Sequence, residues 1–400
     1  DLHWSDPTTL ELIGRLLPTL ARRKVLMILT SRPELPEPIA ANPRLNHLVL
    51  DRLDAAGAQR IAAAVAGEAG LPAALLAEIA RRTDGVPLFV EELTKAMLEA
   101  RMRPGAADDA GPGAAGAAEL MIPATLHDSL LARLDRLGPV KTVAQTAAVI
   151  GRSFRRDLLQ ALSGLDDAAL GAALDLLIAA ELVYPAPNSP ATLDFKHALV
   201  RDAAYESLLR STRRHLHGRL HDLLQSDPTT PPAVVARHAE AGDLPQEAMT
   251  AWEKAGSVAL ARPAYAEATA AFGAAIRVCR SLGDSPANLR QQLRLTNRLG
   301  LAQMGALGYQ AGAVGETFGA ALALAERIGD PDLVFPAVFG LCTHRYTAGH
   351  PFSAFRPLVG RAHDLLDALD DKSRRLNAPR LMALQTVGLF HEARFEAVLA

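Results

Sequence analysis

The sequence is poor in the residues that carry covalent or metal chemistry. Only two of its 400 residues are cysteines, Cys279 and Cys342, and they form no CxxC motif. This spacing argues against a metal site or a disulfide framework and favours two buried, inert thiols in a reducing compartment. The histidines form no HExxH pattern, and neither a G-x-S-x-G elbow nor a cysteine–histidine pair indicates covalent catalysis.

Aromatic residues and net charge are also scarce. Aromatics make up 4% of the chain and the formal net charge is −2, so no overall field attracts nucleic acid or an anionic membrane. No apolar stretch has the length of a membrane helix and no signal peptide opens the sequence, so we expect a cytoplasmic location. The abundance of Ala and Leu favours helices, and the length predicts two to four domains.

A phosphate-binding loop of the form GxxxxGK[ST] is missing from the sequence. Such a loop cradles phosphates with backbone N–H groups and a lysine, so we do not expect this chain alone to hold ATP tightly. The chain begins at Asp1 instead of methionine and ends inside a helical pattern. We therefore interpret it as a piece of a longer protein.

The first quarter of the chain has the pattern of an α/β domain. The continuous apolar run Val25–Thr30 predicts a strand buried on both faces, and Leu48–Leu50 predicts a second short strand. Residues 103–120, rich in Gly, Ala and Asp, predict a flexible linker that ends this domain at residue 102.

The remaining residues predict two helical domains. In 121–228, helices precede two short strands, Leu182–Tyr184 and Thr192–Phe195, which indicates a winged-helix-like domain. In 233–400, similar inter-helix turns recur about every 41–46 residues, the spacing of helix-pair repeats. The expected fold is therefore mainly α: an α/β P-loop NTPase remnant, a winged-helix-like domain, and an incomplete α-α solenoid resembling tetratricopeptide (TPR) repeats.

Residues 1–102 contain three candidate ligand-binding positions. Asp1 stands where a strand of a P-loop NTPase would present an acid to Mg²⁺, although a lone aspartate is usually a surface acid. Arg32 follows the apolar strand, at the edge where parallel sheets bind ligands, and is either a phosphate sensor or an exposed arginine. Gly85 and Pro87 suit a helix end followed by a helix start, which is compatible with packing against a nucleotide base.

Two other clusters are weaker candidates. The arginines 210, 213, 214 and 219 with His215 form a basic patch, but the helix that would read DNA, Asp166–Ala180, has three aspartates and no basic residue. We therefore expect a solvated helix face and no nucleic-acid binding. His215, His217 and His221 lie on one helix without a carboxylate at ligand spacing, which argues against a metal site.

Several segments of residues 1–225, in the same order, resemble STAND-type signalling ATPases. These ATPases accompany bacterial class III adenylyl cyclase domains and also occur in large LuxR/MalT-like regulators. The matching stretches are DLHWSDPTTLEL at 1–12, LTSRPE at 29–34, RTDGVPLFVEELTKAMLE at 82–99, IPATLHDSLLARLDRL at 122–137, VAQTAAVIGRSF at 143–154 and FKHALVRDAAYESLL at 195–209.

The resemblance implies roles for individual residues. Asp1 corresponds to the second acid of Walker B and would act on Mg²⁺ and the attacking water. Arg32 corresponds to the sensor-1 arginine, and Gly85 and Pro87 belong to the GxP motif whose proline approaches adenine. The Walker A lysine and the first Walker B acid have no counterpart in this sequence, so the implied cofactors, ATP or ADP with Mg²⁺, are expected for the longer protein.

The resemblance also implies a function. Nucleotide exchange would switch the packing of the winged-helix-like domain on the ATPase core, the repeats would receive a protein or small-molecule ligand, and the output would be an adenylyl cyclase. The parent protein would be an ATPase and the present chain inactive. Two alternatives remain open: the ATPase core of a LuxR/MalT-like transcription regulator, and a non-enzymatic TPR scaffold.

Overall fold

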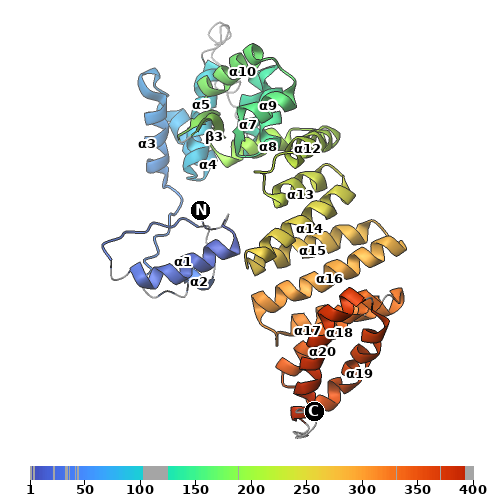
Figure 1. The fold of residues 1–400 in the computed structure, drawn as a ribbon. Coiled ribbons are helices and arrows are strands. Elements are labelled where there is room, and N and C mark those ends of the chain that lie inside the picture. The colour runs from blue at the N-terminus through green and yellow to red at the C-terminus, as the bar shows by residue number, and fades with distance from the viewer. Residues whose placement is uncertain are drawn as a thin grey trace. The chain divides into compact units, whose positions relative to one another are not determined.

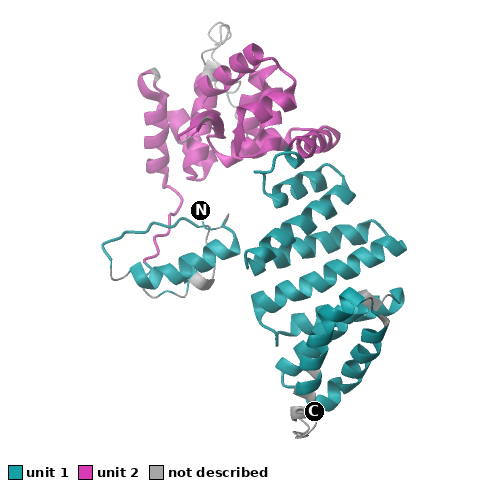
Figure 2. Cartoon of the chain, in the orientation of Figure 1, with its two compact units in different colours: residues 1–45, 224–400 teal, residues 46–223 magenta. Residues whose placement is uncertain are grey.

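The structure, a computed structural model, describes residues 1–400 apart from 1, 3, 4, 21, 22, 32–34, 36, 41, 43, 44, 102–124, 188, 330, 370 and 392–400. The described part is predominantly helical, which confirms the expected fold class (Figure 1). It divides into two compact units, residues 46–223 and residues 1–45 with 224–400 (Figure 2). The predicted domain limits at residues 102, 121, 228 and 233 stay predictions.

The N-terminal segment contains the helices α1 (Pro7–Leu20) and α2 (Glu37–Ala40). Asp6 caps α1: its carboxylate accepts hydrogen bonds from the Thr9 backbone N–H at 2.9 Å and from the Thr9 hydroxyl at 2.6 Å. These hydrogen bonds from Thr9 lower the pKa of Asp6 to about 2. An aspartate directly before a proline at the first helical position is a favoured N-cap, and Asp6 has this role here.

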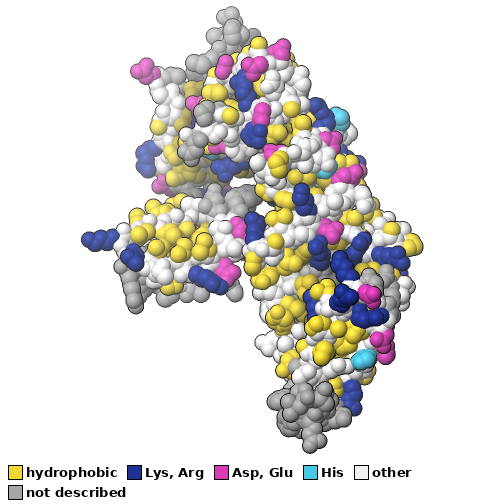
Figure 3. All heavy atoms as spheres, in the orientation of Figure 1, with side chains coloured by type: hydrophobic (Ala, Val, Ile, Leu, Met, Phe, Trp, Pro, Cys, Tyr) yellow, Lys and Arg dark blue, Asp and Glu magenta, His cyan; other side chains and the backbone are white. Residues whose placement is uncertain are grey.

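The prediction of two strands, at residues 25–30 and 48–50, was wrong. Residues 25–30 and 48–50 are extended but pair with no strand, and side chains such as Leu26 and Ile28 are 85% and 80% exposed. Figure 3 shows hydrophobic side chains gathered on the surface of this N-terminal segment. An apolar run meets the side-chain requirement of a buried strand, but a sheet also needs a ladder of backbone hydrogen bonds to neighbouring strands. In the described residues the run 25–30 joins no such ladder, although the Thr30 carbonyl accepts a 2.8 Å hydrogen bond from the Leu2 N–H.

The unit formed by residues 46–223 begins with a small helical bundle. Its helices are α3 (Ala55–Ala66), the short 3₁₀ helix η2 (Gly67–Ala69), α4 (Ala73–Thr83) and α5 (Pro87–Arg101). Asp54 caps α3 by accepting a 2.7 Å hydrogen bond from the Gly57 N–H. Apolar side chains from all three α-helices, including Ala62, Ile79 and Leu93, form one core.

The second half of this unit combines helices with a three-stranded antiparallel sheet. Along the chain these are α7 (Leu126–Arg136), α8 (Val140–Ile150), β1 (Ser153–Arg155), α9 (Arg156–Ser163), α10 (Asp167–Ala179), β2 (Val183–Ala186), β3 (Ser189–Phe195), α11 (Ala198–Glu206) and α12 (Arg210–Gln225). The sheet order is β1-β3-β2, with Phe154 opposite Leu193 and Val183 opposite Phe195. The two predicted strands are confirmed as β2 and β3. The rings of Phe154 and Phe195, 5.4 Å apart, are buried in the core.

The described residues between 232 and 391 form a helical solenoid in which each helix packs on the next. Its helices are α13 (Pro232–Ala241), α14 (Pro245–Ala261), α15 (Tyr265–Ser281), α16 (Pro286–Leu307), α17 (Gly312–Ile328), α18 (Pro331–Thr347), α19 (Phe352–Ala368) and α20 (Asp371–His391). The three repeated turns predicted from the sequence separate α15 from α16, α17 from α18 and α19 from α20. Within the described residues, no helix combines the length and apolarity needed to cross a membrane.

Candidate functional site

The structure describes two of the four predicted site residues. Asp1 and Arg32 lie outside the described residues, so the Mg²⁺ role of Asp1 and the phosphate-sensing role of Arg32 stay predictions. Gly85 and Pro87 are described and form the turn between α4 and α5.

The turn has a backbone that requires glycine at position 85. Asp84 ends α4 in the left-handed region, with φ 48°, and Gly85 follows with φ 69°. The Gly85 carbonyl accepts a 2.8 Å hydrogen bond from the Leu53 N–H, and a Cβ on Gly85 would collide with the Leu53 backbone. Only glycine therefore combines this φ with this close approach. Pro87 then opens α5 with its ring exposed, so the turn presents a fixed apolar surface.

A buried ion pair connects α5 to the domain that follows it. The Arg133 guanidinium on α7 contacts the Glu92 carboxylate on α5, and the two side chains are 5% and 1% exposed. Arg133 also donates a 2.6 Å hydrogen bond to the carbonyl of Ala180, just after α10. One side chain thus holds three helices together. Removing one partner of such a pair leaves an uncompensated buried charge, which makes the contact sensitive to any movement of α5.

A second group of charges surrounds this buried pair. The Lys95 ammonium lies 2.8 Å from Glu91 and 2.5 Å from Glu181, and Lys196 lies 2.9 Å from Glu181 and 3.3 Å from Glu91. Hydrogen bonds from Lys95 and Lys196 lower the pKa of Glu181 to about 2. Burial disfavours the charge of Lys95, but its hydrogen bonds to Glu181 and Glu91 outweigh this effect and raise its pKa. The network ties α5 to the segments that flank β2 and β3.

The sequence analysis missed His197, which lies beside this network. Its ring Nε2 is buried and has no hydrogen-bond partner in the described part of the chain. Burial lowers the pKa of His197, and the carboxylates of Glu91 and Glu92 oppose this effect. His197 lies in the segment 195–209 that resembles the STAND-type ATPases, but no spacing rule distinguishes it from the other histidines.

The predicted basic patch is partly used for packing. Arg213 donates a 3.1 Å hydrogen bond to the carbonyl of Leu208, and Arg219 donates 2.9 Å bonds to the carbonyls of Leu162 and Ala161 at the end of α9. His217 lies 2.9 Å from the Tyr205 hydroxyl. These contacts attach α12 to the preceding helices, because guanidinium groups satisfy carbonyls that a helix end leaves unpaired.

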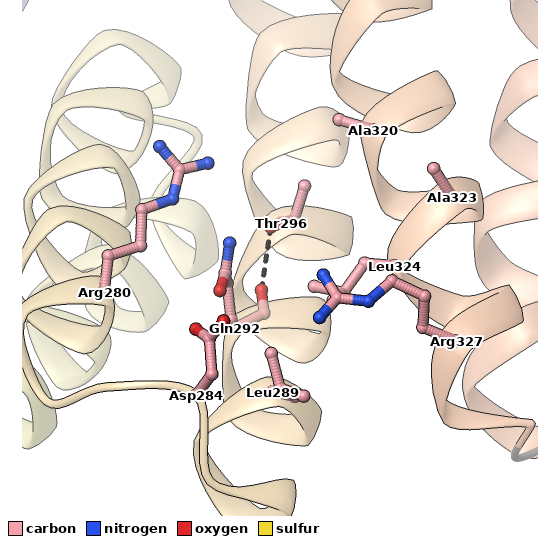
Figure 4. A pocket seen from close by; sticks show the side chains of 9 residues that line it. All are labelled: Arg280, Asp284, Leu289, Gln292, Thr296, Ala320, Ala323, Leu324 and Arg327. Atoms are coloured by element: carbon pink, nitrogen blue, oxygen red, sulfur yellow. Dashed lines mark hydrogen bonds between the residues drawn. The ribbon is translucent and has the colours of Figure 1, made fainter.

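The solenoid has a hollow of about 420 Å³ between α15, α16 and α17 (Figure 4). Its walls carry Arg280 and Arg327, and its lining also includes a carboxylate, two neutral polar side chains and four apolar ones: Asp284, Gln292, Thr296, Leu289, Leu324, Ala320 and Ala323. The Thr296 hydroxyl donates a 2.7 Å hydrogen bond to the carbonyl of Gln292. Sequence reasoning could not find this hollow because its residues come from three helices and share no motif.

The chain is similar to parts of two longer proteins. No family model matches it. It is 28% identical, over 358 residues, to an uncharacterized protein of Rhizobium meliloti strain 1021, covering 85% of this chain and 33% of the relative. A solved structure from Pyrococcus horikoshii, a signal transduction ATPase with numerous domains (STAND) and a tetratricopeptide repeat sensor, is similar with a TM-score of 0.33 and 11% identity. That match covers 90% of this chain and 57% of the solved one. The chain thus spans about a third of the curated relative it matches.

Proposed function

We propose that the chain is part of an ATP-binding signal-transduction ATPase of the STAND type, acting as a nucleotide-dependent switch. The observation that carries the proposal is the position of α5. This helix begins at Pro87, where the GxP turn would contact adenine, and it is held to the following domain through the buried pair of Glu92 and Arg133. A nucleotide bound at one end of α5 would therefore act on contacts along its length.

The switch would work through differential contacts. A ligand shifts a two-state equilibrium only if it binds one arrangement more tightly than the other. Packing against the Gly85–Pro87 turn would favour one position of α5. Because α5 is a single helix, a small displacement at Pro87 would move Glu92 against Arg133 and Lys95 against Glu181. The domain that Arg133 connects to α5 has the order helix, strand, two helices and hairpin from α8 to β3. This order supports its interpretation as a winged helix.

The exposed apolar segments support the nucleotide-binding part of the proposal. Residues 25–30 and 48–50 would become interior strands of a parallel sheet if further strands of an ATPase core lay beside them. Asp1 and Arg32 would then lie at the carboxyl edge of that sheet. Asp1 would hold Mg²⁺, which supplies charge stabilisation to the phosphates, and Arg32 would contact the terminal phosphate. The output would be an adenylyl cyclase or, alternatively, a LuxR/MalT-like DNA-binding domain.

The second candidate is a non-enzymatic scaffold. A complete reading frame that lacks a GxxxxGK[ST] loop would favour it. In a scaffold the α/β part would be vestigial, and the solenoid would carry the function through a protein or small-molecule ligand.

Nucleotide binding by the protein of the complete reading frame separates these candidates. We expect saturable binding of a fluorescent ATP analogue. Pro87→Ala should weaken it about three- to tenfold, because one apolar contact is worth about 1 kcal/mol. Pro72→Ala is the matched control, since Pro72 is also exposed and precedes the helix α4. Arg32→Ala should reduce discrimination between ATP and ADP. Absence of nucleotide binding, with Arg32→Ala changing nothing, would favour the scaffold.

Transmission through α5 needs a separate measurement. The double variant Glu92→Met with Arg133→Met removes both charges, so no uncompensated buried charge remains. It should still bind nucleotide, but the ATP-dependent change in hydrogen exchange of α7 should disappear. A double variant in which α7 responds to ATP as in the original protein would contradict a role of this pair in the switch.

A further inference from the structure

The hollow in the solenoid contains two cations without a carboxylate partner. Arg280 lies in the last turn of α15 and Arg327 in the last turn of α17, and the two helices flank α16. Their guanidinium groups reach toward the space over α16 from either side (Figure 4). Within the part of the chain that the structure describes, neither forms an ion pair, although the neighbouring Arg277 is paired with Glu240. A cation in the last helical turn is favoured by the helix dipole, but the dipole does not require two of them at one hollow.

The rest of the lining defines what would fit between the arginines. Leu289 and Leu324 give the hollow an apolar component, with Leu324 only 8% exposed. Gln292 and Thr296 add neutral polar atoms on α16. A volume of about 420 Å³ is enough for a small organic molecule or a few residues of a peptide. An occupant with an anionic end and an aliphatic part would satisfy both kinds of lining.

The charge of the hollow favours a monoanion. Asp284 lies at the same hollow, so two guanidinium groups and one carboxylate leave a net charge of one positive unit. A carboxylate balances this charge, whereas a doubly charged phosphate would exceed it and meet repulsion from Asp284. Arginine is suited to carboxylates because its planar guanidinium donates two parallel hydrogen bonds to them.

We propose that the hollow between α15, α16 and α17 binds a carboxylate that carries an aliphatic group, with Arg280 and Arg327 as its anion-binding residues. The carboxylate belongs either to a small free acid or to an acidic peptide segment. The proposal names the ligand chemistry for the sensing role of the solenoid. Only the sensing role rests on the proposed function. Carboxylate binding is measured without nucleotide, so its result is independent of whether the protein binds ATP.

Calorimetric titration of the full chain tests the proposal. The probes are hexanoate, a blocked peptide with the sequence Ala-Leu-Glu, and inorganic phosphate. We expect the first two to bind saturably and more tightly than phosphate. Arg280→Gln and Arg327→Gln should each weaken carboxylate binding about tenfold or more, the loss expected for a charge-assisted hydrogen bond. Arg294→Gln is the matched control, because Arg294 is exposed on α16 and does not line the hollow.

The outcomes decide the proposal as follows. Selective loss in the two hollow variants supports it, and the tighter of hexanoate and the peptide identifies the source of the carboxylate. An equal loss in Arg294→Gln would mean that only general electrostatic attraction was measured, and it would overturn the proposal. The proposal is also overturned if neither carboxylate binds, or if phosphate binds at least as tightly. Far-ultraviolet circular dichroism checks that each variant keeps its helical content.

Discussion

Tyr205 is a residue whose surroundings explain a large part of the attachment of α12. Its ring is contacted by two guanidinium groups, Arg201 at 4.7 Å and Arg213 at 5.2 Å, and its hydroxyl is 2.9 Å from Nε2 of His217. Burial, together with the positive charges of Arg201 and Arg213, lowers the pKa of His217 from 6.5 to about 4. His217 is therefore a neutral residue that packs between α11 and α12.

The low pKa of His217 makes the stability of this region dependent on pH. The folded pKa lies below the unfolded one, so the unfolded state binds more protons between pH 6.5 and about 4. The stabilisation is therefore complete above pH 6.5 and is lost as the pH falls toward about 4. A shift of this size corresponds to about 3 kcal/mol at most. Hydrogen exchange of α11 and α12 amides over this pH range should show the loss.

Two variants identify the titrating group. His217→Gln keeps a hydrogen-bonding side chain for Tyr205 but cannot titrate, so the pH dependence of exchange should become flatter. His215→Gln changes an exposed histidine of the same helix and should leave the dependence unaltered. A pH dependence that survives His217→Gln would assign it to another group.

At the scale of helices, the solenoid is built on close contacts between glycine and phenylalanine. Gly300 on α16 and Gly340 on α18 both face the ring of Phe318 on α17, which is 1% exposed. Gly256 on α14 faces Phe272 on α15 in the same way. A glycine lets the backbone of one helix touch an aromatic ring of the next, so the rings fill the inter-helix space without strain.

Adding a methyl group at these contacts should destabilise the solenoid. A Cβ at position 300 would lie 2.5 Å from the Phe318 ring, so Gly300→Ala should lower the free energy of unfolding by about 1–3 kcal/mol through overpacking. Gly319→Ala, on α17 beside Phe318, meets nothing within 4 Å and should instead raise it by about 0.5–1 kcal/mol. Urea unfolding measures both when it is followed by tryptophan fluorescence in a Trp4→Phe background, where Trp252 alone emits. Equal effects of the two substitutions would contradict this account of the packing.

At the scale of the whole molecule, both cysteines lie in the solenoid and report on its opening. Cys279 and Cys342 are buried in different cores, and burial raises the pKa of both thiols, that of Cys342 to about 12. A native solenoid should therefore react very slowly with a disulfide reagent, because only an exposed thiolate attacks it. The labelling rate should increase as urea is added. The Cys279→Ala variant then reports on the core around Cys342, and the Cys342→Ala variant reports on the core around Cys279. Fast labelling of either thiol without urea would show that its core is open.

The sequence by itself determined the features that depend on neighbours along the chain. These are the predominance of helix, the turns between solenoid helices, the cap at Asp6, the strands β2 and β3, and the turn at Gly85 and Pro87. Each follows from local propensity or from a residue that only one backbone conformation accepts. The predicted strand at residues 25–30 failed because a strand depends on partners that a local pattern cannot supply.

Only the tertiary structure decided which distant residues meet. Arg133 and Glu92 are 41 residues apart, and no spacing rule pairs them, yet folding buries them together. In the sequence, Arg280 and Arg327 are two arginines near helix ends with nothing to connect them. The packing of α15 and α17 on α16 places both at one hollow. The physical reason is that burial and electrostatic interaction act through space. The pKa of His217 and the charge of the hollow are therefore properties of the packed helices.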